Sequence, residues 1–488
     1  MTNPQQKADF IITDKKLFQS KLLAFSQSFT PCTILTSNDY YADKDLTKSP
    51  FYYAYDLMAG LGSVKILKAN AGSAFQQLSE FHNELKDWLF GYFSYDLKNE
   101  TEVLKSSHPD LIGLPDMYFF QPEIVLLLKD ENLQIISNSD RRPEEIYEEI
   151  VSRPRSPLAS EGNTSLRLPD SKRGDAGVAH TRRTRATAAI QRHTPNPSQE
   201  GNALPQIPPE SKLKPRFRKK EYTDIVEKLR QHIIEGDVYE ITFCQEFYNE
   251  NIDFEPYAAF ERLVNFAPNP FSCFLKIEDK YVLSASMERF IKKTGSKLIS
   301  QPIKGTIKRD ADELTDDKLK EELRNDPKER AENVMIVDLV RNDLAKSCKP
   351  GTVKVEELFG IYSFPKVHQM ISTVTGEMRD NIEWWRAIKN AFPMGSMTGA
   401  PKVMAMALIE KYEKTRRGVY SGAVGYISPE GDFDFNVIIR TLVYNSLNSS
   451  LSVHAGGAIT YDSVPEKEYE ECLLKIQGLL GAMGMELG

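Results

Sequence analysis

A break in composition between residues 153 and 215 most constrains how this 488-residue chain can fold. The segment is rich in Pro, Ser, Gly, Asn and Arg and poor in large apolar residues. Such a sequence buries too little apolar surface to offset the entropy that is lost on ordering. We therefore predict a disordered insert or linker over 153–215, between an N-terminal β-rich region over 1–152 and a second domain over 216–488.

Strand-like and helical patterns mix on both sides of this break. Before it, apolar runs predict strands at 10–12, 32–35 and 122–128, and 74–88 predicts a helix. After it, Ile225, Leu229 and Ile233 recur at helical spacing, and Gly236 follows as a stop. Further strands are predicted at 238–246, 273–276, 422–427, 433–444 and 451–454, with a hairpin turn at 428–432 and a final helix at 465–483. This mixture indicates a large α+β domain rather than a regular βαβ repeat.

The composition excludes several classes of protein. The net charge of −7 argues against a protein that coats nucleic acid or an acidic membrane, and we interpret the arginine cluster at 182–185 as a solvated run. No apolar run approaches the roughly 20 residues that span a bilayer, and the start of the chain lacks the apolar stretch of a signal peptide. Five scattered cysteines without C-x-x-C spacing favour reduced thiols, and hence the cytoplasm.

A lysine lies inside the segment Pro302-Ile303-Lys304-Gly305-Thr306, for which we predict a tight turn closed by glycine. A lysine on a rigid turn can be held against a substrate. Desolvation there would lower its pKa and free the amine for nucleophilic attack. The alternative is a solvated surface charge, which is the usual role of a lysine.

Two pairs of glutamates are spaced for one helical face each. Glu329 and Glu332 are three apart, as are Glu468 and Glu471, and Lys475 follows Glu471 by four. Brought together, the four carboxylates would form an oxygen site for a divalent cation. Mg²⁺ suits such a site better than Zn²⁺, because no histidine or cysteine set accompanies the carboxylates. The alternative is that they decorate exposed helix faces.

Glycine-rich turns offer candidate anion sites. The segment 392–402 leads into a predicted helix at 403–412, with Pro401 near its first position and Thr398 or the adjoining turn as a cap. Gly456 and Gly457 follow a predicted strand and allow close backbone approach to a ligand. Arg440, expected on a strand, can bind a carboxylate in bidentate fashion. The alternatives are turn-shaping glycines and a structural ion pair, and no P-loop spacing is present.

These motifs, taken together, resemble those of the chorismate-utilising enzymes, which include component I of anthranilate synthase and of aminodeoxychorismate synthase and the isochorismate and salicylate synthases. The resemblance covers nearly all of 221–480 and extends weakly to 91–97. Its motifs include Gly236-Asp237-Val238-Tyr239, Ser286-Met287-Glu288-Arg289-Phe290, Gly399-Ala400-Pro401-Lys402 and the segments 332–343, 420–426, 439–441 and 465–469. It implies the large mixed α/β sandwich of these enzymes, with 216–488 as the chorismate-binding catalytic domain.

The resemblance also implies roles for the candidate residues. Glu332 and Glu471 would ligate Mg²⁺, and Glu329 and Glu468 would support it through water. Glu288 would be the general acid near the leaving C4 hydroxyl, a role that suits a carboxyl whose pKa is raised by burial. The substrate would be contacted by His368, Ser396, Tyr420, Arg440, the backbone of Gly456 and Gly457, and Lys475. For His368, in an apolar strand-like run, the alternative is a core histidine whose hydrogen bonds are satisfied.

Lys304 selects among the members of the resembled family. Anthranilate synthases and the water-adding members usually have alanine there, whereas aminodeoxychorismate synthases have a lysine that attacks C2. The water-adding members carry a base lysine where this chain has Glu240, and amine-using members commonly have glutamine there. Met287 also departs from the proline that usually precedes the acid. No match to the Leu-Glu-Ser element of tryptophan-binding members is evident.

The resemblance therefore predicts conversion of chorismate and ammonia to 4-amino-4-deoxychorismate, for para-aminobenzoate and folate synthesis. No cysteine lies in the G-x-C-x-G context of the associated glutaminases. Ammonia would be free or supplied by a separate glutamine amidotransferase subunit in a heterodimer. The alternatives are anthranilate synthase component I and a catalytically silent chorismate-binding subunit.

Overall fold

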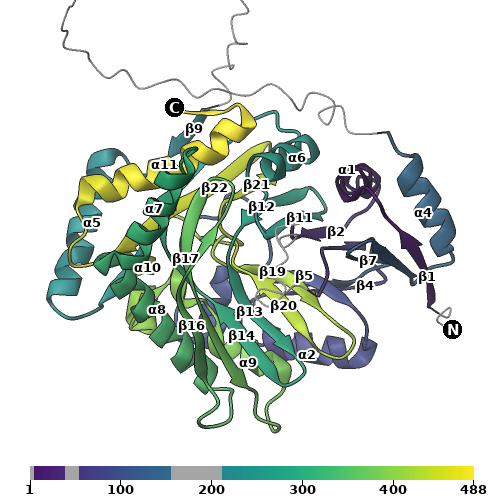
Figure 1. Cartoon of the computed structure of the whole chain (residues 1–488), viewed down its shortest axis with the longest axis horizontal. Coiled ribbons are helices and arrows are strands. Elements are labelled where there is room, and N and C mark those ends of the chain that lie inside the picture. The colour runs from purple at the N-terminus through teal and green to yellow at the C-terminus, as the bar shows by residue number, and fades with distance from the viewer. Residues whose placement is uncertain (1–4, 39–53, 155–211) are drawn as a thin grey trace, which may run out of the picture.

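The computed structural model describes residues 5–38, 54–154 and 212–488, which form two large sheets covered by helices (Figure 1). Most of the predicted insert at 153–215 lies outside the described residues. Its last four residues, Lys212–Pro215, form strand β9. Regular structure therefore resumes before the predicted boundary at residue 216.

The first sheet joins 13 strands of the described chain from both sides of the composition break. Strand β2 pairs with β11, and Ile34 lies opposite Phe274. The strand order is β1 (Gln6–Ile11), β8 (Asn132–Ser137), β7 (Ile124–Lys129), β3 (Leu57–Leu61), β2 (Cys32–Thr36), β11 (Phe271–Ile277), β12 (Lys280–Ser286), β21 (Thr441–Asn445), β22 (Ser450–Ile459), β10 (Glu240–Asn249), β9 and β23 (Glu486–Leu487), with β18 (Gly399–Ala400) also paired to β10.

The second sheet has 10 strands in the described chain and is also shared between the two regions. Strand β5 pairs with β19, and Gly91 lies opposite Gly425. The strand order is β15 (Ile303–Lys308), β17 (Val367–Glu377), β14 (Lys297–Gln301), β13 (Arg289–Thr294), β20 (Phe433–Asn436), β19 (Ala423–Ile427), β5 (Leu89–Phe93), β6 (Met117–Gln121) and β4 (Lys65–Ala69), with β16 (Lys354–Ser363) also paired to β17.

Helices cover the outer faces of both sheets (Figure 1). The first sheet packs against α1 (Lys15–Ser26), α4 (Pro143–Ser152), α5 (Lys219–Ile234), α6 (Pro256–Phe266), α10 (Lys402–Tyr412) and α11 (Pro465–Met483). The second sheet packs against α2 (Ala74–Leu85), α8 (Pro327–Ala345) and α9 (Trp384–Ala391), and the remaining helices are α3 (Lys98–Thr101) and α7 (Glu313–Asn325).

Alternating side chains of the strands divide the core into layers. In β7, Ile124, Leu126 and Leu128 face the helices of the first sheet, whereas Val125 and Leu127 face a cluster made largely of strand residues from both sheets. This alternation follows from the two-residue period of a strand. The predicted α+β class and the mixed sandwich are therefore confirmed.

The two helices that carry the paired glutamates begin at defined caps. The side chain of Asp326 accepts hydrogen bonds from the backbone N–H groups of Lys328 and Glu329, and Pro327 occupies the first position of α8. Helix α11 begins with Pro465 and ends before Gly484, whose φ of 66° is left-handed. The bounds predicted for α11 are confirmed, and these starts fix which helical face carries the carboxylates.

Three sequence-based predictions of local structure were wrong. The segment 433–444 forms two strands in different sheets, and Arg440 lies in the break between them with φ +52°. Strand β22 continues through Gly456 and Gly457 instead of ending before them. Lys304 lies in strand β15 and not in a turn, because the segment pairs with β17 on both sides of an irregularity.

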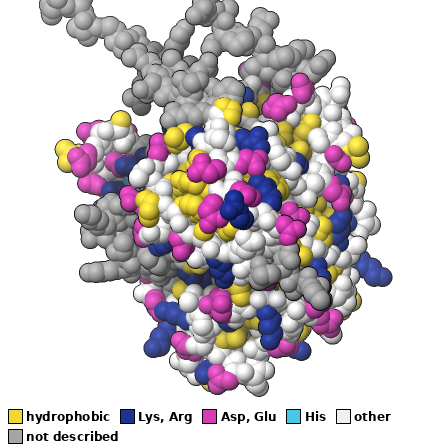
Figure 2. Space-filling model, turned by 90° about the vertical axis from the view of Figure 1, so that its right-hand side faces the viewer, with side chains coloured by type: hydrophobic (Ala, Val, Ile, Leu, Met, Phe, Trp, Pro, Cys, Tyr) yellow, Lys and Arg dark blue, Asp and Glu magenta, His cyan; other side chains and the backbone are white. Residues whose placement is uncertain are grey.

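Figure 2 shows acidic and basic side chains interspersed on one face of the molecule. Among the described helices, none combines the length and the apolar character that a membrane crossing requires.

Candidate functional site

Lys304 faces a buried carboxylate across the gap between the two sheets. The β15–β17 register shifts between Ile303 and Thr306, and Gly305 there has φ +95°. The Nζ atom of Lys304 lies 2.5 Å from Oε1 of Glu240, the first residue of β10. The side chain of Lys304 is 11% exposed and that of Glu240 is 0% exposed. The irregularity thus places a lysine of the second sheet against a carboxylate of the first.

The prediction that burial leaves Lys304 with a lowered pKa was wrong. Burial does lower the pKa of its amine, but the negative charges of Glu240, Glu332 and Glu288 raise it further, and the net pKa lies above its ordinary value. The sequence allowed either a desolvated lysine or a solvated surface charge. It did not show that carboxylates from three separate segments would surround the amine.

Glu288 lies between β12 and β13, where its side chain is buried. Burial raises the pKa of this carboxyl to about 7, although the Ser396 hydroxyl, the Lys304 charge and the backbone of Ile303 each lower it. The backbone N–H of Val437 donates a hydrogen bond to the Glu288 carbonyl, with an N···O distance of 3.0 Å. A carboxyl that is substantially protonated near neutral pH can donate a proton to a leaving group.

The four paired glutamates approach the same region from two helices. A Cβ added to Gly457 would lie 3.3 Å from Oε2 of Glu468 and 3.5 Å from Oε1 of Glu471. A Cβ added to Gly305 would lie 3.2 Å from Oε2 of Glu329. Burial acts to lower the pKa of Lys328, but the negative charges of all four glutamates outweigh it, and the net pKa is raised. The two helices therefore bring the carboxylates to the strands that carry Lys304 and Gly457.

Burial and neighbouring charges shift the pKa values of these glutamates in different directions. Burial, reinforced by neighbouring carboxylates, raises the pKa of Glu332 to about 7 and raises those of Glu329 and Glu468. Burial also acts to raise the pKa of Glu471, but Lys475 and other lysines outweigh it and the net pKa is lowered. Glu332 and Glu468 are buried, whereas the side chain of Glu471 is 50% exposed. Within the described structure, no three of the four carboxyls place an oxygen each within 4.8 Å of one another.

Arg440 is a cation without a fixed partner in the described structure. Its guanidinium makes no hydrogen bond or ion pair with any described residue. Burial lowers its pKa, whereas Tyr420 and Glu471 act to raise it. The ring of buried Tyr420 stacks on His454 at a centroid distance of 5.1 Å, and its hydroxyl lies 3.8 Å from Sγ of Cys244. A half-buried guanidinium beside a tyrosine suits an anionic ligand.

Lys475 and the two glycines connect this anion region to the glutamates. Nζ of Lys475 lies 2.7 Å from both the Gly456 carbonyl and Oε1 of Glu471. A Cβ on Gly456 would lie 1.9 Å from the Phe243 carbonyl. Gly456 is therefore required by the close approach of β22 and β10, whereas Gly457 borders the glutamates.

Ser396 is buried in a short 3₁₀ helix, Gly395–Met397, that precedes β18 and α10. The next residue but one, Thr398, donates its hydroxyl to the Met394 carbonyl at 3.1 Å and does not cap α10. The Ser396 hydroxyl is buried and makes no hydrogen bond within the described structure, and it lies close enough to Glu288 to lower the pKa of that carboxyl.

His368 does not offer a free nitrogen to this site. Its Nε2 lies 2.8 Å from Oδ1 of Asp316 and its Nδ1 lies 2.9 Å from Oγ of Ser363, so both ring nitrogens are engaged. The alternative of a satisfied core histidine describes it better than the predicted contact with substrate. The next residue, Gln369, points the opposite way, since its amide nitrogen lies 3.5 Å from Oγ1 of Thr306 in β15.

Sequence reasoning missed Gln369. Its amide oxygen is buried and has no hydrogen-bond partner among the described residues. Because side chains alternate along a strand, residues 368 and 369 are expected on opposite faces. Only His368 was named as a candidate, because histidine is the more common functional residue.

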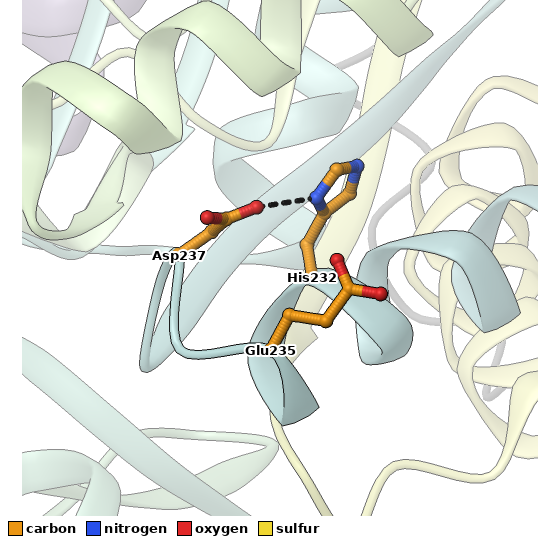
Figure 3. Close-up of side chains that lie close together, drawn as sticks. All are labelled: His232, Glu235 and Asp237. Carbon is orange, nitrogen blue, oxygen red and sulfur yellow. Dashed lines mark hydrogen bonds and ion pairs between the residues drawn. The ribbon is translucent and has the colours of Figure 1, made fainter.

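A different group of possible metal ligands among the described residues is formed by His232, Glu235 and Asp237 (Figure 3). Nδ1 of His232 lies 2.7 Å from Asp237, and its Nε2 lies 3.0 Å from the hydroxyl of Tyr412, while Glu235 is exposed. Both histidine nitrogens are used within the protein. The group therefore links the end of α5 to α10 and is not assigned a metal.

Comparison with known proteins defines the class to which this fold and this site belong. The model of the chorismate binding enzyme family matches residues 48–481. The chain belongs to this family and is a chorismate-utilising enzyme.

Two kinds of relative resemble the chain. Anthranilate synthase component 1 of Aquifex aeolicus is 31% identical over 395 residues, which cover 81% of this chain and 74% of that protein. Aminodeoxychorismate synthase component 1 of Salmonella typhimurium is 40% identical over 260 residues. That match covers 53% of this chain and 57% of the relative, so it spans little more than half of each protein.

Solved structures share the fold. Anthranilate synthase component I from Streptococcus pneumoniae superimposes with a TM-score of 0.66 at 25% identity, covering 86% of this chain and 91% of the other. The menaquinone-specific isochorismate synthase of Escherichia coli gives a TM-score of 0.68 at 16% identity, covering 99% and 95%. The architecture is therefore common to enzymes named for different products, and the fold does not choose between them.

Proposed function

We propose that this chain is an aminodeoxychorismate synthase component I, which converts chorismate and ammonia to 4-amino-4-deoxychorismate. The observation that carries the proposal is the position of Lys304, buried between the sheets beside Glu240 and influenced by the charge of Glu288. A nucleophile near a carboxyl that is substantially protonated at neutral pH suits a substitution with a poor leaving group. The 40% identical aminodeoxychorismate synthase of Salmonella typhimurium supports this choice.

In the proposed reaction, Lys304 and Glu288 have complementary roles. The amine of Lys304 forms a bond to C2 of chorismate while the C4–O bond breaks. The carboxyl of Glu288 protonates the departing hydroxyl, which leaves as water. Ammonia then forms a bond to C4, and the C2–N bond to Lys304 breaks, so that the enzyme is regenerated.

The remaining candidate residues would hold the substrate. Glu332 and Glu471 would bind Mg²⁺ directly, and Glu329 and Glu468 would do so through water. When bound, this ion supplies positive charge for the ring carboxylate of chorismate. The substrate carboxylates would be fixed by Tyr420, Arg440, the backbone of Gly456 and Gly457, and Lys475, with Ser396 lining the site near Glu288. His368 is left out of this set because both of its ring nitrogens are engaged.

The ammonia would be free or come from a separate glutamine amidotransferase subunit. All five cysteines are buried and free, and burial raises the pKa of Cys32 and Cys273 to about 12. A glutaminase needs a reactive thiolate, which these buried thiols do not provide. A heterodimer with an amidotransferase, working in folate synthesis, fits this chain best.

The test is incubation of the purified chain with chorismate, MgCl₂ and ammonium, followed by product identification. We expect 4-amino-4-deoxychorismate from the wild type and none from Lys304→Ala. Unchanged product formation by Lys304→Ala would overturn the assignment of the nucleophile. Omission of Mg²⁺, with chelator present, should remove the activity.

Anthranilate synthase is the second candidate, because the Aquifex aeolicus relative matches 81% of this chain. It predicts anthranilate and pyruvate in the same incubation. Release of pyruvate in proportion to consumed chorismate would favour it over the proposed function. A chain without any turnover under these conditions would instead be a silent chorismate-binding subunit.

A further inference from the structure

The chain crosses between the two sheets in two neighbouring links, and each link carries a residue of the candidate site. The acid link, 287–288, joins β12 of the first sheet to β13 of the second and contains Glu288. The arginine link, 437–440, joins β20 of the second sheet to β21 of the first and contains Arg440. Because β12 pairs with β21 and β13 pairs with β20, the two links run side by side (Figure 1). Contacts between the links therefore set the acid and the arginine relative to each other.

Ser286, the last residue of β12, closes a ring of hydrogen bonds around the acid link. Its hydroxyl donates to the Val437 carbonyl at 2.6 Å and accepts from the backbone N–H of Glu288 at 3.2 Å. The backbone N–H of Val437 donates to the Glu288 carbonyl at 3.0 Å. Ser286 is buried, so bulk water does not compensate for a lost hydroxyl. Its removal would break two of the three hydrogen bonds that hold Glu288 against Val437.

Ser284 lies two residues earlier on the same face of β12 and makes the corresponding contacts with the arginine link. Its hydroxyl donates to the Ile439 carbonyl at 3.0 Å and lies 2.9 Å from that of Thr441, the residue opposite it in β21. The backbone N–H of Ala285 donates to the Arg440 carbonyl at 3.1 Å. Arg440 has φ +52°, and a non-glycine residue keeps this left-handed conformation only where its surroundings hold it. The buried Ser284 is one of the groups that hold it.

Both serines use their hydroxyl hydrogen within the protein, so holding the links suits them better than contact with a substrate. The two links serve different steps. Glu288 must meet the leaving hydroxyl as the C4–O bond breaks, whereas Arg440 must hold a carboxylate before and during the reaction. A misplaced acid should therefore slow the chemical step, and a misplaced arginine should weaken the binding of the substrate.

We propose that Ser286 and Ser284 are separate positioning residues, Ser286 for the acid Glu288 and Ser284 for the anion-binding Arg440. This inference rests on the proposed function, in which Glu288 protonates the departing hydroxyl and Arg440 fixes a carboxylate of chorismate. Ser286 acts on the rate of bond breaking through the acid link. Ser284 acts on the affinity for chorismate through the arginine link.

The experiment compares Ser286→Ala with Ser284→Ala, which each remove one buried hydroxyl from the same strand. The consumption of chorismate with MgCl₂ and ammonium is measured, and the products are identified separately. We expect Ser286→Ala to lower kcat by about 10- to 100-fold and to change KM for chorismate by less than about threefold. We expect Ser284→Ala to raise KM by about 5- to 20-fold and to leave kcat within about threefold of wild type.

Double variants show whether each serine acts through its own partner. Glu288→Gln removes the proton donor, so a hydroxyl that only positions the acid has nothing left to position. Adding Ser286→Ala to Glu288→Gln should therefore lower kcat by less than about twofold. Adding Ser284→Ala to Arg440→Ala should likewise raise KM by less than about twofold. Equal losses with and without the partner would show a general disturbance of the structure and would overturn the assigned role.

A matched control lies in helix α1. Ser26 is buried, and its hydroxyl donates to the Leu23 carbonyl at 2.8 Å. Ser26→Ala loses a comparable hydrogen bond and should leave kcat and KM within about twofold of wild type. Effects as large as those of the β12 variants would overturn both roles. If an alanine variant of Ser286 or Ser284 does not fold, the cysteine variant, which keeps a weak donor, should fold and show the same direction of change to a smaller extent.

The outcomes separate this inference from the proposed function. A wild type that converts chorismate to a different product overturns the proposed function alone, because kcat and KM for that conversion still test the two serines. A wild type that consumes no chorismate overturns both. If the product is 4-amino-4-deoxychorismate and the two alanine variants show the same changes in kcat and KM, or none, only the separate roles of the serines are overturned.

Discussion

Two buried lysines of this protein make the same contact and differ in their surroundings. Lys304 and Lys402 each lie 2.5 Å from a carboxylate oxygen, of Glu240 and Asp343 respectively, and their side chains are 11% and 10% exposed. Burial lowers the pKa of Lys402, and the net shift stays downward. Burial also lowers that of Lys304, but surrounding carboxylates reverse the shift.

The two lysines differ in pKa because different charged groups surround each ion pair. Lys304 is influenced by three glutamates, whereas Lys402 shares Asp343 with Lys346 and donates to the Ala391 carbonyl at 3.0 Å. Lys402 thus ties the start of α10 to α8 through satisfied contacts. Lys304 lies in an excess of negative charge, which is tolerable in a site that receives cations and releases protons.

The largest expected effect on activity comes from removing the amine of Lys304. Lys304→Ala should lower 4-amino-4-deoxychorismate formation by at least about 10³-fold or divert chorismate to another product, because the nucleophile is gone. Chromatography of reaction products with an ammonium-dependent assay measures this. If Lys402→Ala binds chorismate as tightly as Lys304→Ala and loses product formation to the same extent, the two lysines do not differ as we propose.

Lys402 should matter more for stability than for chemistry. Lys402→Ala leaves Asp343 buried without its closest cation, so we expect the free energy of unfolding to fall by about 3–5 kcal/mol. Urea denaturation followed by circular dichroism gives this value. Any folded fraction should retain ammonium-dependent turnover, and complete inactivity of a well-folded variant would contradict the assigned role.

The raised pKa of Glu288 predicts a pH dependence of stability and of activity. The pKa of Glu288 is raised to about 7, so its folded-state pKa lies above the unfolded value and the reactive form is the protonated one. Between about pH 4.5 and 7 the folded state binds more protons than the unfolded state, and this contribution to stability declines as pH rises through that window. The protonated fraction of Glu288, and with it the advantage of the wild type over a variant without this acid, should fall about tenfold per pH unit above pH 7.

A pH–rate profile of wild type between pH 5.5 and about 9 tests this prediction. Glu288→Gln should be slow throughout and lack the decline. The ratio of the wild-type rate to the Glu288→Gln rate cancels the titration of ammonia and of Lys304, and a ratio that stays constant above pH 7 would remove Glu288 as the acid.

The smallest expected effect is the loss of stability on removing Lys346, the second lysine beside Asp343. Lys346, half exposed at 49%, lies 3.0 Å from the other oxygen of Asp343. Lys346→Ala should cost at most about 1 kcal/mol, because exposed ion pairs are screened by solvent. The same urea titration measures it. A cost as large as that of Lys402→Ala would mean that burial does not separate the two lysines.

Much of the candidate site could be predicted from the sequence, and the failures have physical causes. Spacings of three and four residues predicted the faces of α8 and α11 that carry the glutamates, because helix geometry is local. The position of Lys304 in a strand could not be predicted, since a proline and a glycine indicate a turn unless another strand pairs with the segment. Arg440 was misplaced for a related reason, because the chain changes sheets at that residue.

Local chemistry therefore fixed the class of the protein and the kinds of groups it uses. Composition, helical spacing and ordered motifs were enough for an α+β chorismate-utilising enzyme with paired glutamates and a conspicuous lysine. The tertiary structure alone decided which charges meet. Glu240 and Lys304 are 64 positions apart and come from different sheets, and the raised pKa of Lys304 depends on distances that no local pattern contains. It also decided that His368 faces Asp316 while Gln369 faces Thr306, because only the packed sheet defines which side of a strand is the site.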